Sequence, residues 1–230
     1  MTVTAAEAAT TAPRTSWRRW IGLHVGFGFA AAVVLPLPVP AFGWRVLGLV
    51  VGYHIACVLI SRRGRDPLLW RAWTILAPLS VLMVLPDWFL SDVLGSLAFT
   101  VEGGPHLGTV PLAMAGMWTI ALMPVVGCAW WARERAGTPA AVAAAAASGA
   151  VVFIGAELAA PALGLWEPVG VATVAGVASY VLLPEIVLSV AAAMLVCFAE
   201  ALPRPALAGL TVLLPFTYLG LLASSYQLLG

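Results

Sequence analysis

Long apolar runs, interrupted by short groups of arginine, glycine and proline, dominate the pattern of this chain. A helix needs about 20 apolar residues to cross the roughly 30 Å hydrocarbon core of a bilayer. Segments close to that length are predicted near residues 20–40, 43–61, 67–86, 109–131, 139–160, 182–202 and 204–226. The pattern therefore predicts an all-α fold, a polytopic membrane helical bundle of about seven transmembrane helices.

The N-terminal segment differs from the rest of the chain. Residues 1–16 are mostly Ala and Thr and carry no apolar period, so they are predicted to be a disordered cytoplasmic tail. Residues 17–230 are predicted to form a single transmembrane helical domain. A signal peptide is the alternative for the first span, because arginines precede it and Pro38-Val39-Pro40-Ala41 offers a small-residue exit. The helix count favours a retained span.

Composition supports a membrane protein and excludes several functions. Hydrophobic residues make up 62% of the chain and charged residues 9%, with a mean hydropathy of +1.02, which cannot cover a water-facing surface. A net charge of +1 argues against nucleic acid as a partner. The absence of lysine excludes a Schiff base with retinal. Cys57, Cys128 and Cys197 lack CxxC spacing, so neither a disulfide framework nor a metal site is predicted, and no cofactor is expected.

The arginines predict the orientation, because cytoplasmic loops carry an excess of positive charge. If seven helices alternate, ten of the eleven arginines fall on one side and only Arg45 lies opposite. The N-terminus is therefore predicted to be cytoplasmic and the C-terminus external, in the cell membrane. The ten are Arg14, Arg18, Arg19, Arg62, Arg63, Arg65, Arg71, Arg133, Arg135 and Arg204.

Six acids gather at the opposite side, at the outer ends of spans or in the connections there, where the adjacent loops supply no arginine to pair with them. A charged residue at membrane depth costs several kcal/mol and is a functional candidate by default. We therefore regard this group as the most informative feature of the sequence. The six are Asp87, Asp92, Glu102, Glu157, Glu167 and Glu185.

Two stretches that carry these acids have a similar design, residues 86–111 and 156–185. In each, an acid at or near a helix end is followed by Gly and an aromatic residue, and then by a proline that is expected to head the next helix. We predict two pseudo-repeats, each a helix, a re-entrant or interfacial connection, and a helix. Non-helical backbone at membrane depth is tolerated where it is buried in protein or lines a cavity. A cavity is therefore expected between the repeats, open toward the outer leaflet.

The motifs Pro86-Asp87-Trp88, Gly164-Leu165-Trp166 and Leu183-Pro184-Glu185 resemble the repeat of the small integral-membrane lycopene cyclases of actinobacteria and fungi. That family carries Pro-Trp-Asp and Pro-x-Glu-Glu elements in each half. The resemblance covers residues 86–131 and 155–200. This chain has Pro-Asp-Trp order, one acid at Glu185 where the family has a pair, and no acid after Pro111. The related membrane-bound cyclases of prenylated aromatic or indole compounds fit the size and the spans equally well.

The residues suit acid-initiated cyclisation of a hydrophobic isoprenoid without a metal. A carboxylic acid in an apolar site stays protonated near neutral pH because desolvation disfavours its anion, so Asp87, Glu157 and Glu185 are the candidate catalytic residues. His106 is a candidate proton relay. Aromatic faces attract carbocations, as they attract other cations. The candidate substrate-binding residues are Trp88, Phe89, Phe99, Trp118, Phe153, Trp166 and Tyr180.

Other functions remain open at this stage. A DDxxD magnesium box and a glycine-rich phosphate cradle are absent from the sequence, which favours a neutral substrate. A proton-coupled small-molecule transporter is the main alternative, since such carriers combine midplane acids with paired repeats. The apolar inner halves of the later spans favour a one-sided pocket. A carotenoid hydratase and a subunit of a larger membrane complex are the other options, and the oligomeric state is open.

Overall fold

The computed structural model describes residues 17–230, and the predicted tail at residues 1–16 lies outside the described residues. The chain is mainly helical, and five of its described helices are long and apolar enough to cross a membrane. This protein is therefore a helical membrane protein. The helical elements are α2 (Trp17–Val34), α3 (Phe42–Gly64), α4 (Pro67–Leu82), α5 (Val84–Trp88), the π-helical turn η1 (Phe89–Val93), α6 (Met114–Leu163), α7 (Ser179–Phe198), the 3-10 turn η2 (Ala199–Ala201) and α8 (Arg204–Leu229).

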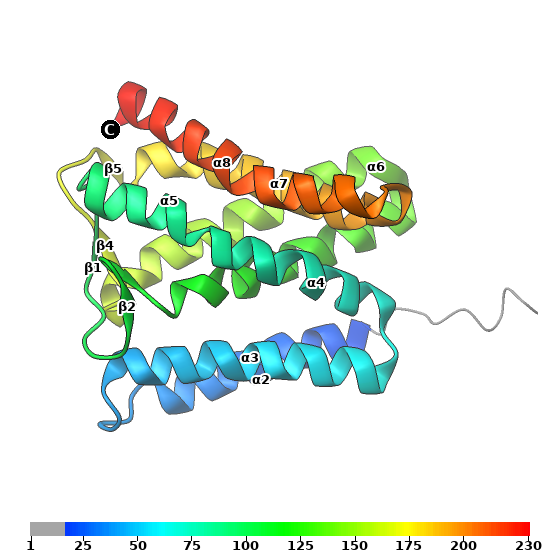
Figure 1. Ribbon diagram of the computed structural model, residues 1–230, viewed down its shortest axis with the longest axis horizontal. Coiled ribbons are helices and arrows are strands. Elements are labelled where there is room, and N and C mark those ends of the chain that lie inside the picture. Colours follow the sequence, from blue (N-terminus) through cyan, green and yellow to red (C-terminus); the bar gives the residue numbers. More distant parts are fainter. Residues whose placement is uncertain (1–16) are drawn as a thin grey trace, which may run out of the picture.

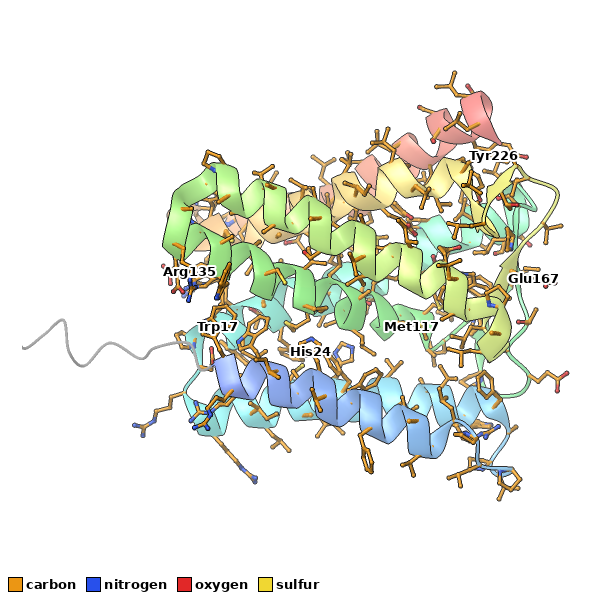
Figure 2. All side chains as sticks on the ribbon, turned by 180° about the vertical axis from the view of Figure 1, so that it is seen from behind. Trp17, His24, Met117, Arg135, Glu167 and Tyr226 are labelled. Atoms are coloured by element: carbon orange, nitrogen blue, oxygen red, sulfur yellow. The ribbon has the colours of Figure 1, made fainter. Side chains whose placement is uncertain are left out.

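The longest helix, α6, consists of two arms that fold back on each other at Gly137. This glycine has φ 78° and ψ −170°, a backbone conformation that is unfavourable for residues with a side chain. The rings of Trp118 on the first arm and Phe153 on the second have centroids 5.4 Å apart, so the arms run antiparallel and pack together. Figure 2 shows both arms leaving the end of the molecule where Arg135 is labelled.

The turn between α3 and α4 is specified by local chemistry. Asp66 is the N-cap of α4, and its side chain accepts a hydrogen bond of 3.1 Å from the backbone N–H of Leu69. Pro67 occupies the first helical position, where its missing donor is not needed. A predicted helix boundary at residue 67 therefore agrees with the structure.

Six short strands form within the connections that we expected to be re-entrant or interfacial, and the all-α prediction did not include them. β1 (Leu97–Phe99) pairs with β4 (Trp166–Pro168), β2 (His106–Leu107) with β3 (Val110–Pro111), and β5 (Thr173–Val174) with β6 (Val177–Ala178), all antiparallel. Ala175 and Gly176 both have positive φ in the β5–β6 turn, as a type I′ two-residue hairpin turn requires.

The same order of elements occurs twice along the chain. The first unit, residues 67–136, and the second unit, residues 138–201, each contain a helix, a strand, a two-stranded hairpin and a helix. β1 of the first unit pairs with β4 of the second, with Ala98 opposite Glu167. Figure 1 shows these strands together at one end of the helices. The two units therefore meet at a layer of short strands.

Two predicted helix starts were wrong. Pro111 lies in β3, and α6 begins later, at Met114; Pro184 lies inside α7, which begins earlier, at Ser179. Glu185 is therefore inside a helix and not in its first turn. Hydropathy does not distinguish a short apolar strand from the start of an apolar helix, because both are continuous apolar runs.

The α2–α3 pair forms a layer beside α4–α8, as Figure 1 shows. His54 on α3 joins the layers, because its Nε2 donates to the carbonyl of Gly116 at 3.1 Å and its Nδ1 accepts from the indole of Trp73 at 3.1 Å. The main core lies between α4, α6, α7 and α8. Its fully buried side chains include Leu76, Leu79, Leu122, Leu188 and Leu222.

The two ends of the molecule differ in chemistry. Figure 2 labels Trp17 and Arg135 at one end, and Glu167 and Tyr226 at the other. At the arginine-rich end, Arg133 lies over the rings of Trp130 and Phe198, and Arg71 forms an ion pair with Glu200. The strand layer lies at the opposite end.

Candidate functional site

A cavity of about 420 Å³ lies between the two units, beside α2 and α3. Pockets of roughly 300–1,000 Å³ hold drug-sized ligands. The side chains of Asp87 on α5, Glu157 on the second arm of α6 and Glu185 on α7 all line it. The structure thus brings together three acids that are up to 98 positions apart in the sequence.

Asp87 is almost fully buried, with 3% of its surface exposed. Its Oδ2 accepts a hydrogen bond of 3.1 Å from the indole Nε1–H of Trp118 on the first arm of α6. Its other oxygen makes no hydrogen bond within residues 17–230. The indole fixes the orientation of this carboxyl at the cavity wall.

Glu157 has a similar arrangement but is less buried. Its Oε1 accepts a hydrogen bond of 3.0 Å from the indole Nε1–H of Trp166. Trp166 lies in β4, directly after the turn that ends α6 at Gly164. The second unit therefore positions this acid with an indole from its own strand.

Glu185 differs from the other two acids because its side chain accepts no hydrogen bond within residues 17–230. It is 4% exposed, and its Oε2 is fully enclosed without a hydrogen-bond partner in the described part of the chain. The hydroxyl of Ser189, one turn further along α7, is also enclosed without a partner. Glu185 lies close enough to Glu157 and Asp87 for their charges to interact.

Several aromatic residues contribute to the cavity wall. The ring of Trp118 lies between Phe153, at 5.4 Å, and Tyr218, at 5.5 Å between centroids. Phe99, Trp166 and Tyr180 also line the cavity. The Tyr180 hydroxyl forms a 2.8 Å hydrogen bond with the hydroxyl of Ser96.

Three of the predicted site residues lie outside this cavity. Trp88 is 41% exposed, and together with Phe89 it lines a small apolar pocket against α8. Successive residues of a helix point about 100° apart, so Asp87 can face the cavity while its two neighbours face away. His106 is exposed in β2, where its Nδ1 contacts the carbonyl of Gly104 at 3.2 Å.

Tyr218 and Ser96 are cavity residues that the sequence analysis missed. Tyr218 lies in α8, which also carries Thr211, Thr217, Ser225 and Tyr226, so no signal in the sequence distinguishes it from the other polar residues of this helix. Ser96 follows Gly95 in a connection, and nothing in its sequence context distinguishes it from a turn residue.

The cavity carboxyls do not form a metal site. Within residues 17–230, no group of three or more His, Cys, Asp or Glu side chains is arranged to hold a metal ion. The cavity lining also contains no arginine in the described chain, so a bound diphosphate would have no cation to pair with. The arrangement suits proton chemistry on a neutral, apolar molecule.

The family model described as "Domain of unknown function (DUF6989)" matches residues 84–229 of this chain. The matched range includes Asp87, Glu157, Glu185 and Tyr218, and it begins within the first unit. No curated protein and no solved structure shows a significant match to the chain.

Proposed function

The chain belongs to the DUF6989 family, and we propose that it is a membrane-embedded, metal-independent, acid-initiated cyclase of a hydrophobic isoprenoid. The observation that carries the proposal is the convergence of three carboxyl side chains on one aromatic-lined cavity inside an apolar helical bundle. Intramembrane ionisable residues are costly and usually functional. The substrate class is a terpene, a prenylated aromatic or indole compound, or a carotenoid-type polyene.

The proposal includes a topology. We propose that the chain crosses the cell membrane seven times, through α2, α3, the α4–η1 run, the two arms of α6, α7 and α8. Arg62, Arg133 and Arg204 then lie near the cytoplasmic face, which supports a cytoplasmic N-terminus and an external C-terminus. We also propose that the two units are pseudo-repeats. Their common element order and the β1–β4 pairing support this.

The reaction would run as an isomerisation. A carboxylic acid O–H protonates an alkene carbon of the bound substrate, forming a C–H bond and leaving a carboxylate and a carbocation. A second alkene attacks the cation, which closes a ring by a new C–C bond and moves the charge along the chain. A carboxylate then removes a proton beside the final cation, and a new C=C bond forms. The product has the mass of the substrate.

The hydrogen bonds support a division of roles among the acids. A carboxylate at Glu185 would be an unpaired buried charge, so this residue is the better proton donor. Asp87 and Glu157 each accept an indole N–H, which stabilises a carboxylate that receives the final proton. The proton then returns to Glu185 within the cavity, which all three carboxyl side chains line.

The aromatic wall suits the charged intermediates. Aromatic faces attract cations within about 6 Å, and the contribution reaches roughly 2 kcal/mol when the pair is desolvated. Trp118 contacts both Phe153 and Tyr218 in the core and donates to Asp87. This cluster supports a site in which positive charge migrates without meeting bulk water.

The resemblance to membrane lycopene cyclases supports the same chemistry, and the departures at Glu185 and Pro111 leave the substrate within the wider isoprenoid class. A proton-coupled transporter is the second candidate, because paired units around acids also occur in carriers. The cavity lining extends no further toward the arginine-rich end than Phe27, Ala121 and Val152. A one-sided pocket favours the enzyme over a carrier, and a hydratase would use the same acids with water as the nucleophile.

A membrane-fraction assay in EDTA tests the proposal. Linear prenylated aromatics, their epoxides and lycopene are offered to the wild type and to Glu185→Gln, which removes the proposed proton donor, and products are analysed by mass spectrometry. We expect a product of unchanged mass and altered retention with the wild type, and loss of that product with the variant. A product heavier by one water would indicate the hydratase, and proton-coupled uptake without conversion would indicate the transporter.

A further inference from the structure

We infer that the hydroxyl of Tyr218 binds an oxygen atom of the substrate, so that the ligand of this cavity is an oxygenated isoprenoid and not a pure hydrocarbon. This inference rests on the cavity being the substrate site proposed above. The oxygen belongs to an alcohol, ether, carbonyl or phenol group, since each of these accepts a hydrogen bond from a phenolic O–H.

Tyr218 comes from α8, outside the two units that supply the acids. Its side chain is 2% exposed and lines the cavity, and its ring contacts Trp118 edge-on. It lies close enough to Glu185 and Asp87 to interact with their charges. A ligand atom held by Tyr218 would therefore lie at the same end of the cavity as the acids.

The Tyr218 hydroxyl has no hydrogen-bond partner within residues 17–230. The Tyr218 hydroxyl oxygen is also not fully enclosed by protein atoms, in contrast to the unpaired Glu185 Oε2 and Ser189 hydroxyl oxygens. The hydroxyl is therefore both unpaired in the protein and in contact with the cavity. Buried tyrosine hydroxyls usually have a partner, so this one is available for a ligand.

Tyr180 provides an internal comparison. It is the same residue type, lines the same cavity and is equally buried, but its hydroxyl is already bonded to Ser96 at 2.8 Å. A ligand oxygen would gain little from a hydroxyl that is already engaged. Tyr218 and Tyr180 thus differ in the one property that matters for binding an oxygen, and Tyr180→Phe is the matched control for Tyr218→Phe.

The test uses two ligands with one carbon skeleton, farnesol and farnesene. Full-length protein in lipid nanodiscs is titrated with each ligand, and the dissociation constants are obtained from quenching of tryptophan fluorescence. We expect Tyr218→Phe to weaken farnesol binding roughly threefold to tenfold, the value of one neutral hydrogen bond, and to leave farnesene binding unchanged. Comparing variants with the same ligand cancels the difference in membrane partitioning. Tyr180→Phe should change the two affinities by the same factor, because its hydroxyl is bonded to Ser96 and does not distinguish an oxygenated ligand from a hydrocarbon.

Equal effects of Tyr218→Phe on the two ligands, or no effect on either, would overturn the inference. If Tyr218→Phe does not fold, the wild type alone can test the inference with farnesyl methyl ether, which accepts a hydrogen bond but cannot donate one. Wild-type protein should bind it more tightly than farnesene after correction for partitioning, and equal binding would overturn the inference.

The inference and the proposed function fail in different ways. Selective loss of farnesol binding in Tyr218→Phe, with no isomerisation of any substrate by the wild type, would retain the oxygen subsite and reject the cyclase. Isomerisation of a hydrocarbon, with identical farnesol affinities in the wild type and Tyr218→Phe, would retain the cyclase and reject the subsite.

Discussion

The two units place different side chains at the same distance along the chain from the end of their hairpins. The seventh residue after the end of β3 is Trp118 in the first unit, and the seventh residue after the end of β6 is Glu185 in the second. Both side chains line the cavity from the helix that follows the hairpin. The first unit therefore presents an indole N–H where the second presents a carboxyl.

This difference explains why the acids are not equivalent. In the first unit, the indole N–H of Trp118 donates to Asp87. In the second unit, Glu185 has no indole N–H to offer, and Glu157 accepts its hydrogen bond from Trp166 in β4. The second unit consequently contributes two acids to the cavity and the first contributes one. Two units with the same order of elements thus contribute unequally to the cavity, and the proposed donor and acceptor of one proton need such a difference.

The largest effect is expected from Glu185→Gln, which removes the acid that distinguishes the second unit. The variant keeps the shape of the side chain but cannot protonate an alkene. We expect turnover to fall by at least about 100-fold, the lower range for loss of a general acid. Product formation in membrane fractions at matched expression measures it. Glu167→Gln, an exposed acid in β4, is the control, and its turnover should stay unchanged. Wild-type turnover in Glu185→Gln would assign the proton donor to another acid.

A smaller effect is expected from removing the indole donors one at a time. Trp118→Phe leaves Oδ2 of the buried Asp87 without a donor, which costs about 1–3 kcal/mol, and weakens the aromatic wall. We expect turnover to fall roughly tenfold, as 1.4 kcal/mol corresponds to a factor of ten. Trp166→Phe should have a weaker effect, because Glu157 is only half-buried. Initial rates of the two variants provide the comparison, and a larger loss in Trp166→Phe would contradict it.

Helix contacts behind the site should affect stability and not chemistry. A methyl group at Gly149 would overlap the side chain of Ser189 between the second arm of α6 and α7. We expect Gly149→Ala to destabilise the protein by about 1–3 kcal/mol, the usual cost of overpacking. Thermal unfolding in detergent measures this, and Ser189→Gly should restore the lost stability in the double variant. Gly155→Ala on the same arm is the control, because its added methyl group meets nothing.

The smallest effect is expected at His106, in the hairpin of the first unit. The side chain is exposed and lies outside the cavity, so a proton relay through it has no structural support. His106→Gln should leave turnover within about twofold of the wild type, as is usual for a surface residue that touches no ligand. A large loss of turnover, with normal expression, would mean that the hairpin closes over the cavity during the reaction.

Much of the helical framework is predictable from the sequence, because the bilayer imposes long apolar runs and local caps such as Asp66 mark their ends. The short strands are not, because runs of two or three residues carry no periodicity that distinguishes them from helix termini. Their pairing joins residues 97–99 to residues 166–168, and nothing in either segment alone specifies the other.

The sequence by itself determined that this is a helical membrane protein and that Asp87, Glu157 and Glu185 are its unusual residues, because charge is costly in an apolar medium wherever it lies. Only the tertiary structure decided that these acids share one cavity, that Trp88 and Phe89 face away from it, and that Tyr218 completes it. Hydropathy measures the character of a residue, whereas a site depends on which faces of distant helices meet. That meeting is decided by packing, at contacts such as Gly149 against Ser189.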